Sequence, residues 1–128
     1  MAILDANMIL RYLLNDQQEM ADRAERYLHD GNVFVTIEVI AEVVYVLKGV
    51  YSLDRSVIAE TINGLLELVD CQEKRVLTIA LHTYGQRNLD FVDCVLYGYH
   101  AVKGAEIATF DKKLLKLIAE RQNETAAF

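Results

Sequence analysis

The chain has 128 residues, 53% of them apolar and 25% charged, which is typical of one globular domain and excludes a disordered or fibrous protein. The net charge of −6 excludes a nucleic-acid-binding protein that relies on a broadly basic surface, and it favours carboxylates that hold cations or a basic partner. We expect a single domain over residues 1–128. Because no proline occurs, we also expect long uninterrupted helices.

The first half of the chain predicts short strands that alternate with helices. Apolar residues 2–5 end at a polar turn, as a buried parallel strand would. Asp16-Gln17-Gln18-Glu19 matches a capping box, and Thr36 is a plausible N-cap. The expected elements are a strand over 2–5, a helix over 8–14, a helix from 16 to about 29, a strand over 33–35 and a helix from 36 to 48.

The second half continues this alternation. The expected elements are a helix capped by Asp54 and ending near 64–67, a strand over 68–70, a helix over 73–87, a helix over 91–103 capped by Asp90, a strand over 107–109 and a helix over 111–118. Parallel strands need crossover connections, so the class is predicted as α/β: a three-layer sandwich with a short parallel sheet of four to five strands and helices on both faces. The tail from about residue 120 lacks an apolar run, and we expect it to be frayed.

The lengths of the apolar runs and the spacing of the cysteines indicate the cellular location and the state of the thiols. The apolar runs are far shorter than the roughly 20 residues that cross a bilayer, and no basic stretch precedes an apolar one at the N-terminus. We therefore expect a cytoplasmic protein without a membrane segment. Cys71 and Cys94 lack the paired spacing of a zinc or redox motif, so both are expected to be reduced packing residues.

Acidic residues gather where ligands bind in α/β sheets. Asp5 and Asp111 each follow a predicted strand, and Asp93 is the third residue of the helix that Asp90 opens. Ligands bind outside the carboxyl ends of parallel strands, so these acids are expected on one edge. Glu42 interrupts an apolar helix, where an unpaired buried charge would need a cation.

Each of these acids also has a purely structural explanation. Asp5, Asp90 and Asp111 are good helix caps, Asp93 fits a capping box, and a single Glu such as Glu42 often reaches solvent. The coincidence of four acids near one edge favours a site for Mg²⁺ or Mn²⁺, because these hard cations prefer oxygen ligands.

Four short motifs between Ile3 and Lys113 carry a resemblance to a known family. They are 3–13 (ILDANMILRYL), 41–47 (AEVVYVL), 90–94 (DFVDC) and 109–113 (TFDKK). Each motif is weak alone, but their order and spacing resemble PIN-domain ribonucleases of the VapC toxin type, the toxin half of VapBC toxin–antitoxin pairs. The chain departs from the family at Ala6, where a hydroxyl residue is common, and in its tail, which does not support the family's last edge strand.

The resemblance implies a fold, an activity and partners. It implies a parallel α/β sandwich that hydrolyses RNA phosphodiester bonds with bound Mg²⁺ or Mn²⁺, an RNA substrate and a cognate antitoxin. By resemblance, the metal-binding and catalytic acids are Asp5, Glu42, Asp93 and Asp111. A homodimer or an antitoxin groove would also cover the apolar residues 43–47, which nearly encircle their helix, although a central core helix explains them equally well.

Other polar residues are candidates for supporting roles. Asn7, Thr109 and Asp90 are expected to orient carboxylates or water around the site. Arg11 and Lys112 are expected to contact RNA phosphates, although exposed cations often only keep a protein soluble.

Two other functions remain open at this point. A haloacid-dehalogenase-like phosphatase also begins with a strand and an Asp, but it needs a second Asp where this chain has Asn7. A non-catalytic α/β interaction domain would use the same acids only as helix caps, and it would neither bind metal nor cleave RNA.

Overall fold

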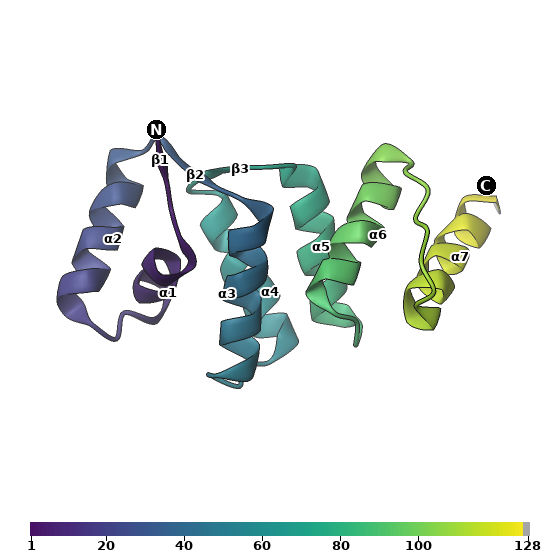
Figure 1. Cartoon of the computed structure of the whole chain (residues 1–128), viewed down its shortest axis with the longest axis horizontal. Helices are drawn as coiled ribbons and strands as arrows, with labels where there is room; N and C mark the ends of the chain where they lie inside the picture. The colour runs from purple at the N-terminus through teal and green to yellow at the C-terminus, as the bar shows by residue number, and fades with distance from the viewer. Residues whose placement is uncertain (127–128) are drawn as a thin grey trace.

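The computed structural model describes the backbone of residues 1–126 and the side chains of residues 1–124. Its elements are β1 (Ala2–Ile3), α1 (Ala6–Leu14), α2 (Gln18–Asp30), β2 (Val33–Val35), α3 (Ile37–Gly49), α4 (Arg55–Leu66), β3 (Asp70–Cys71), α5 (Lys74–Gln86), α6 (Phe91–Lys103) and α7 (Lys112–Ala126). Each helix packs against a neighbour along the chain. Figure 1 shows the short sheet over the part of the molecule from α2 to α5, with α6 and α7 following beyond it. No helix among the described residues is long and apolar enough to cross a membrane.

The sheet is parallel, with the order β1-β2-β3. Ala2 pairs with Val33 at one end, and Val35 pairs with Cys71 at the other. These parallel pairings, connected by helices, confirm the predicted α/β class. β1 ends at Ile3 rather than at residue 5, and Leu4 connects it to Asp5, which caps α1; this helix begins at Ala6, two residues earlier than predicted.

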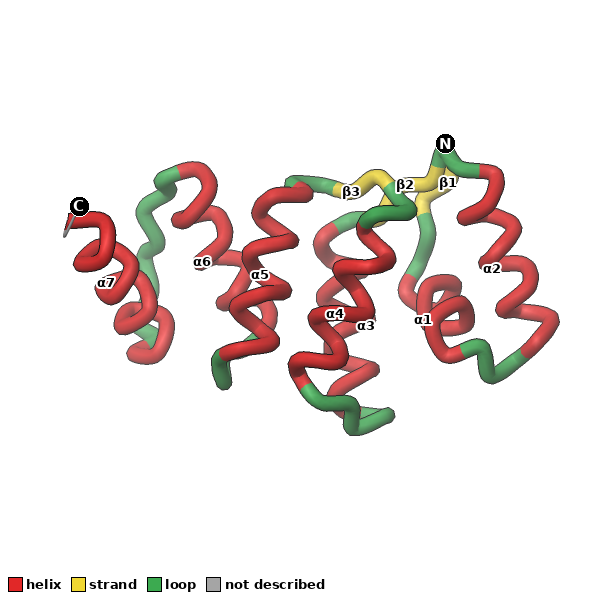
Figure 2. Tube along the Cα trace, turned by 180° about the vertical axis from the view of Figure 1, so that it is seen from behind, coloured by secondary structure: helices red, strands yellow, loops and turns green. Residues whose placement is uncertain are grey.

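The number of strands differs from the prediction. Residues 1–126 contain three strands rather than four to five, and β3 begins two residues later than predicted. The expected strand over 107–109 is wrong: these residues belong to the loop between α6 and α7, drawn in green in Figure 2. Ile107 is only half-buried, and the Thr109 hydroxyl accepts a hydrogen bond from the Asp111 backbone N–H at 3.0 Å. This local bond competes with strand pairing, which explains the difference.

One apolar cluster forms the core and extends from Leu4 to Leu117. At its centre, α5 and α6 approach closely because Gly98 has no side chain: a Cβ there would lie 2.7 Å from the backbone oxygen of Val76. Phe91 begins α6 and is fully buried, with its ring 5.9 Å from the ring of Tyr84 in an edge-on arrangement. The start of α6 is therefore held firmly against α5.

Helix ends agree with the predicted side-chain caps at three positions and differ at three others. The side chains of Asp5, Thr36 and Asp111 accept bonds from backbone N–H groups three residues on, at 2.8, 3.3 and 2.8 Å. Asp54 and Asp90 occupy the positions before α4 and α6, but neither side chain accepts a capping hydrogen bond. The predicted capping box at Asp16 is wrong, because this carboxylate binds the Arg11 guanidinium at 2.9 Å and α2 begins without a side-chain cap. At the other end of the chain, where we expected fraying, α7 is helical through Ala126, and residues 127–128 lie outside the described part.

Candidate active site

An acidic cavity lies between the start of α6 and the start of α7. It has a volume of about 260 Å³ and is lined by Asn88, Leu89, Asp90, Asp93, Asp111, Lys112 and Lys113. Two helix starts and the loop before α6 supply all of these residues, and the buried Leu89 and Phe91 anchor the α6 side in the core. The structure therefore brings together four of the predicted site residues: Asp90, Asp93, Asp111 and Lys112.

The carboxylates in this cavity influence one another. Partial burial, and then the negative charges of Asp111 and Asp90, raise the pKa of Asp93 above its ordinary value. Like charges at close range oppose ionisation, so the site favours a neutralising cation. Its oxygen ligands fit Mg²⁺ or Mn²⁺, because Mg²⁺ is commonly held by one or two carboxylates together with water. Among the described side chains, no three His, Cys, Asp or Glu groups converge as a ready ligand set.

Asp5 and Glu42 do not line the acidic cavity. Asp5 is exposed at the start of α1, where its Oδ1 accepts a bond from the Met8 backbone N–H. Glu42 is exposed on α3, so the expectation that it lies in an apolar environment is wrong. The buried side of α3 is made by Ile40, Val43, Val44 and Leu47.

The predicted supporting residues have different surroundings. Thr109 holds the backbone of Asp111 through the bond described above, and Asn7 is exposed in the first turn of α1. The Arg11 guanidinium binds Asp16 at 2.9 Å and lies 3.5 Å from the Tyr51 hydroxyl, outside the lining of the acidic cavity. Of the two predicted RNA contacts, only Lys112 lies beside the acidic residues.

Sequence reasoning missed Arg55, which anchors the loop that leads into Asp90. Its guanidinium donates hydrogen bonds to the backbone oxygens of Tyr84 at 3.1 Å, Arg87 at 2.9 Å and Leu89 at 2.9 Å. It also lies over the Tyr84 ring, 4.0 Å from the centroid. Every residue has a backbone oxygen, so the partners of Arg55 cannot be recognised from residue types. The one hint of this role in the sequence is an Arg at the start of a largely apolar helix.

Comparison with known proteins agrees with the motifs. The family model described as PIN domain matches residues 2–120. A protein named VapC ribonuclease, from Aquifex aeolicus (strain VF5), is 28% identical over 125 residues, which cover 91% of this chain and 92% of that relative. No solved structure gives a significant match.

Proposed function

Because the chain belongs to the PIN domain family, we propose that it is a divalent-metal-dependent endoribonuclease, the toxin of a toxin–antitoxin pair. The observation that carries this proposal is the acidic cavity, where Asp93 lies beside Asp90 and Asp111 and next to Lys112. Carboxylates next to a cation are the groups that phosphodiester hydrolysis requires: the acids hold metal, and the lysine attracts phosphate. The similarity to a VapC ribonuclease supports RNA as the substrate.

The residues proposed to hold Mg²⁺ or Mn²⁺ are Asp93 and Asp111, with Asp5 and Glu42 completing the set directly or through water. The chemistry that such an ion supplies when bound is activation of water and neutralisation of charge on the phosphate. The bond from the Leu114 N–H to Oδ1 of Asp111 fixes the direction of that carboxylate before any ligand binds. Asp111 therefore loses little side-chain freedom when it binds a cation.

The remaining polar residues are proposed to bind and orient the substrate. Lys112 lies in the acidic cavity and can donate hydrogen bonds to a phosphate oxygen. Thr109 holds the backbone at Asp111, and Asn7 is proposed to bond to the Asp5 carboxylate or to water in the assembled site. Arg55 keeps the entry to α6 in place and thereby positions Asp90 and Asp93.

A cytoplasmic location, a cognate antitoxin and a homodimer belong to the same proposal. Of the apolar residues 43–47 on α3, Val43, Val44 and Leu47 are buried in the core, which is the central-helix explanation. Tyr45 is 51% exposed and is the part of this run that remains accessible to a partner. Size-exclusion chromatography with light scattering tests the dimer, and a monomer at all concentrations would contradict it.

Cleavage of a mixed-sequence RNA by the purified protein tests the activity. We expect cleavage with Mg²⁺ or Mn²⁺, none with excess EDTA, and none for Asp93→Asn, which keeps the size of the side chain but removes its charge. Asp70→Asn is a matched control, because Asp70 is exposed on β3 and does not line the acidic cavity. Cleavage by Asp93→Asn at the wild-type rate would remove this residue from the site.

A further inference from the structure

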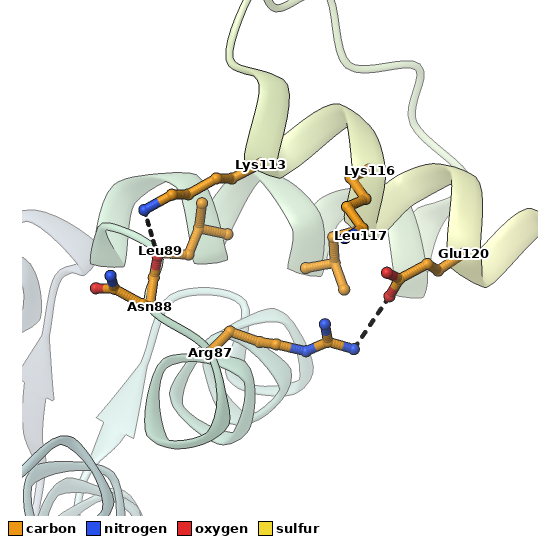
Figure 3. A pocket seen from close by; sticks show the side chains of 7 residues that line it. All are labelled: Arg87, Asn88, Leu89, Lys113, Lys116, Leu117 and Glu120. Atoms are coloured by element: carbon orange, nitrogen blue, oxygen red, sulfur yellow. Dashed lines mark hydrogen bonds and ion pairs between the residues drawn. The ribbon is translucent and has the colours of Figure 1, made fainter.

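A second pocket adjoins the acidic cavity and differs from it in charge. It has a volume of about 280 Å³ and lies between the loop that precedes α6 and the side of α7 (Figure 3). It is lined by Arg87, Asn88, Leu89, Lys113, Lys116, Leu117 and Glu120, and we call it the basic pocket. Asn88, Leu89 and Lys113 line both spaces, so the two pockets are adjacent.

Cations predominate in the basic pocket. It contains Arg87, Lys113 and Lys116 but a single carboxylate, Glu120, in a chain whose formal net charge is −6. Figure 3 shows Arg87 reaching across the pocket to Glu120, where the Arg87 Nη2 and Glu120 Oε2 atoms are 3.1 Å apart. This pair is exposed, with 52% and 37% of the two side chains accessible, so it contributes little to folding. Breaking this pair to release Arg87 for a ligand therefore costs little stability.

The geometry points to a site for the sugar–phosphate backbone of single-stranded RNA beside the bond that is cleaved. This inference rests on the proposed ribonuclease function and assigns Lys113, Lys116 and Arg87 to substrate binding. The pocket has room for a single nucleotide unit rather than a duplex, and the apolar side chains of Leu89 and Leu117 lie between its cations. An RNA strand that runs from the basic pocket into the acidic cavity would contact the cations first and the metal-binding carboxylates next.

RNA explains this arrangement better than an acidic protein partner does. An acidic peptide in the basic pocket would be repelled by Asp90, Asp93 and Asp111 as soon as it extended into the acidic cavity. A phosphate of RNA would also be repelled by these carboxylates alone, but a divalent cation bound between them would attract it. Glu120 then competes with RNA phosphate for Arg87, and its removal should favour binding.

The inference predicts opposite effects of two charge changes on RNA affinity. Both are measured in the otherwise wild-type protein with Mg²⁺ present, using a fluorescently labelled single-stranded RNA 10-mer with a phosphorothioate backbone that slows cleavage. Lys113→Ala combined with Lys116→Ala should weaken binding about five- to tenfold, the size expected of two exposed ion pairs. The slope of log K against log salt should fall by about 0.7 for each lost phosphate contact. Glu120→Gln should strengthen binding.

Controls separate this inference from the proposed function. Lys48→Ala combined with Lys74→Ala removes the same charge from exposed positions outside both spaces and should change affinity far less. In the wild-type background, the pocket variants should raise KM by a larger factor than they lower kcat. If wild type cleaves RNA but the pocket variants behave like this control, the inference is wrong and the proposed function stands. If wild type neither binds nor cleaves RNA, both are wrong.

A second probe distinguishes RNA from a protein partner. A poly-glutamate peptide should bind the wild-type protein and the double variant with Lys113→Ala and Lys116→Ala equally weakly. If that substitution instead abolishes peptide binding and leaves RNA affinity unchanged, the pocket belongs to an acidic protein partner and the inference is overturned.

Discussion

Replacing Arg55 should destabilise the fold and loosen the loop that leads into the acidic cavity. The guanidinium donates to three backbone oxygens on two sides of the turn between α5 and α6 and stacks on Tyr84. A hydrogen bond from a charged group contributes about 1.5–3 kcal/mol net, and a cation–π contact about 0.5–2 kcal/mol. These terms are not additive, and single substitutions rarely cost more than about 5 kcal/mol, so we expect Arg55→Ala to cost about 3–5 kcal/mol.

Arg55→Lys separates charge from geometry. Lysine keeps the positive charge but cannot reproduce the planar fork that reaches several oxygens at once, so we expect a loss of about 2 kcal/mol. Urea unfolding followed by circular dichroism measures both variants. Arg75→Ala on the exposed side of α5 is a matched control and should stay within about 0.5 kcal/mol of wild type. A loss below about 1 kcal/mol for Arg55→Ala would refute this account of the loop.

Three further predictions concern packing and ionisation. Gly98→Ala should cost about 1–3 kcal/mol in urea unfolding, because the added Cβ would lie 2.7 Å from the Val76 backbone oxygen; wild-type stability would contradict the close approach of α5 and α6. Burial raises the pKa of Cys94 to about 12, so this thiol should resist Ellman's reagent until the protein unfolds, and rapid native-state labelling of a Cys71→Ser variant would show otherwise. The pKa of Asp93 is raised in the folded state, so its contribution to stability is present at low pH and is lost as the pH rises through that folded-state value. Metal-free Asp93→Asn should therefore melt no lower than wild type at pH 7 in calorimetry, and a clearly lower Tm would indicate that Asp93 acts only as a structural group.

The sequence was most informative where the determinants are local. Apolar spacing and expected capping residues together predicted each helix in residues 1–126, and the caps at Asp5, Thr36 and Asp111 follow from short-range geometry. The sequence placed Asp93 and Asp111 on one edge, and they do line one cavity, but Asp5 and Glu42, which were expected on the same edge, do not line it. In contrast, the alternation of elements suggested a strand over 107–109, where local bonding keeps a loop.

The error at Glu42 has a physical cause that the sequence also contained. Glu38, Glu42 and Tyr45 recur at intervals of four and three residues, which places them on one side of a helix, and all three are exposed. Composition around Glu42 suggested burial, but helical spacing decides which side faces the core. The role of Arg55 was not predictable in this way, because its partners are backbone oxygens about 30 residues further along the chain.

The central claim is that carboxylates at the starts of α6 and α7 hold the metal that RNA cleavage requires. The most direct test is Mn²⁺ binding by isothermal titration calorimetry and RNA cleavage on the same preparations of wild type, Asp93→Asn and Asp70→Asn. We predict that cleavage by wild type rises over the same Mn²⁺ range as binding, that Asp93→Asn loses both, and that Asp70→Asn keeps both. Cleavage that persists in EDTA, or Mn²⁺ binding that is unchanged in Asp93→Asn, would contradict the claim.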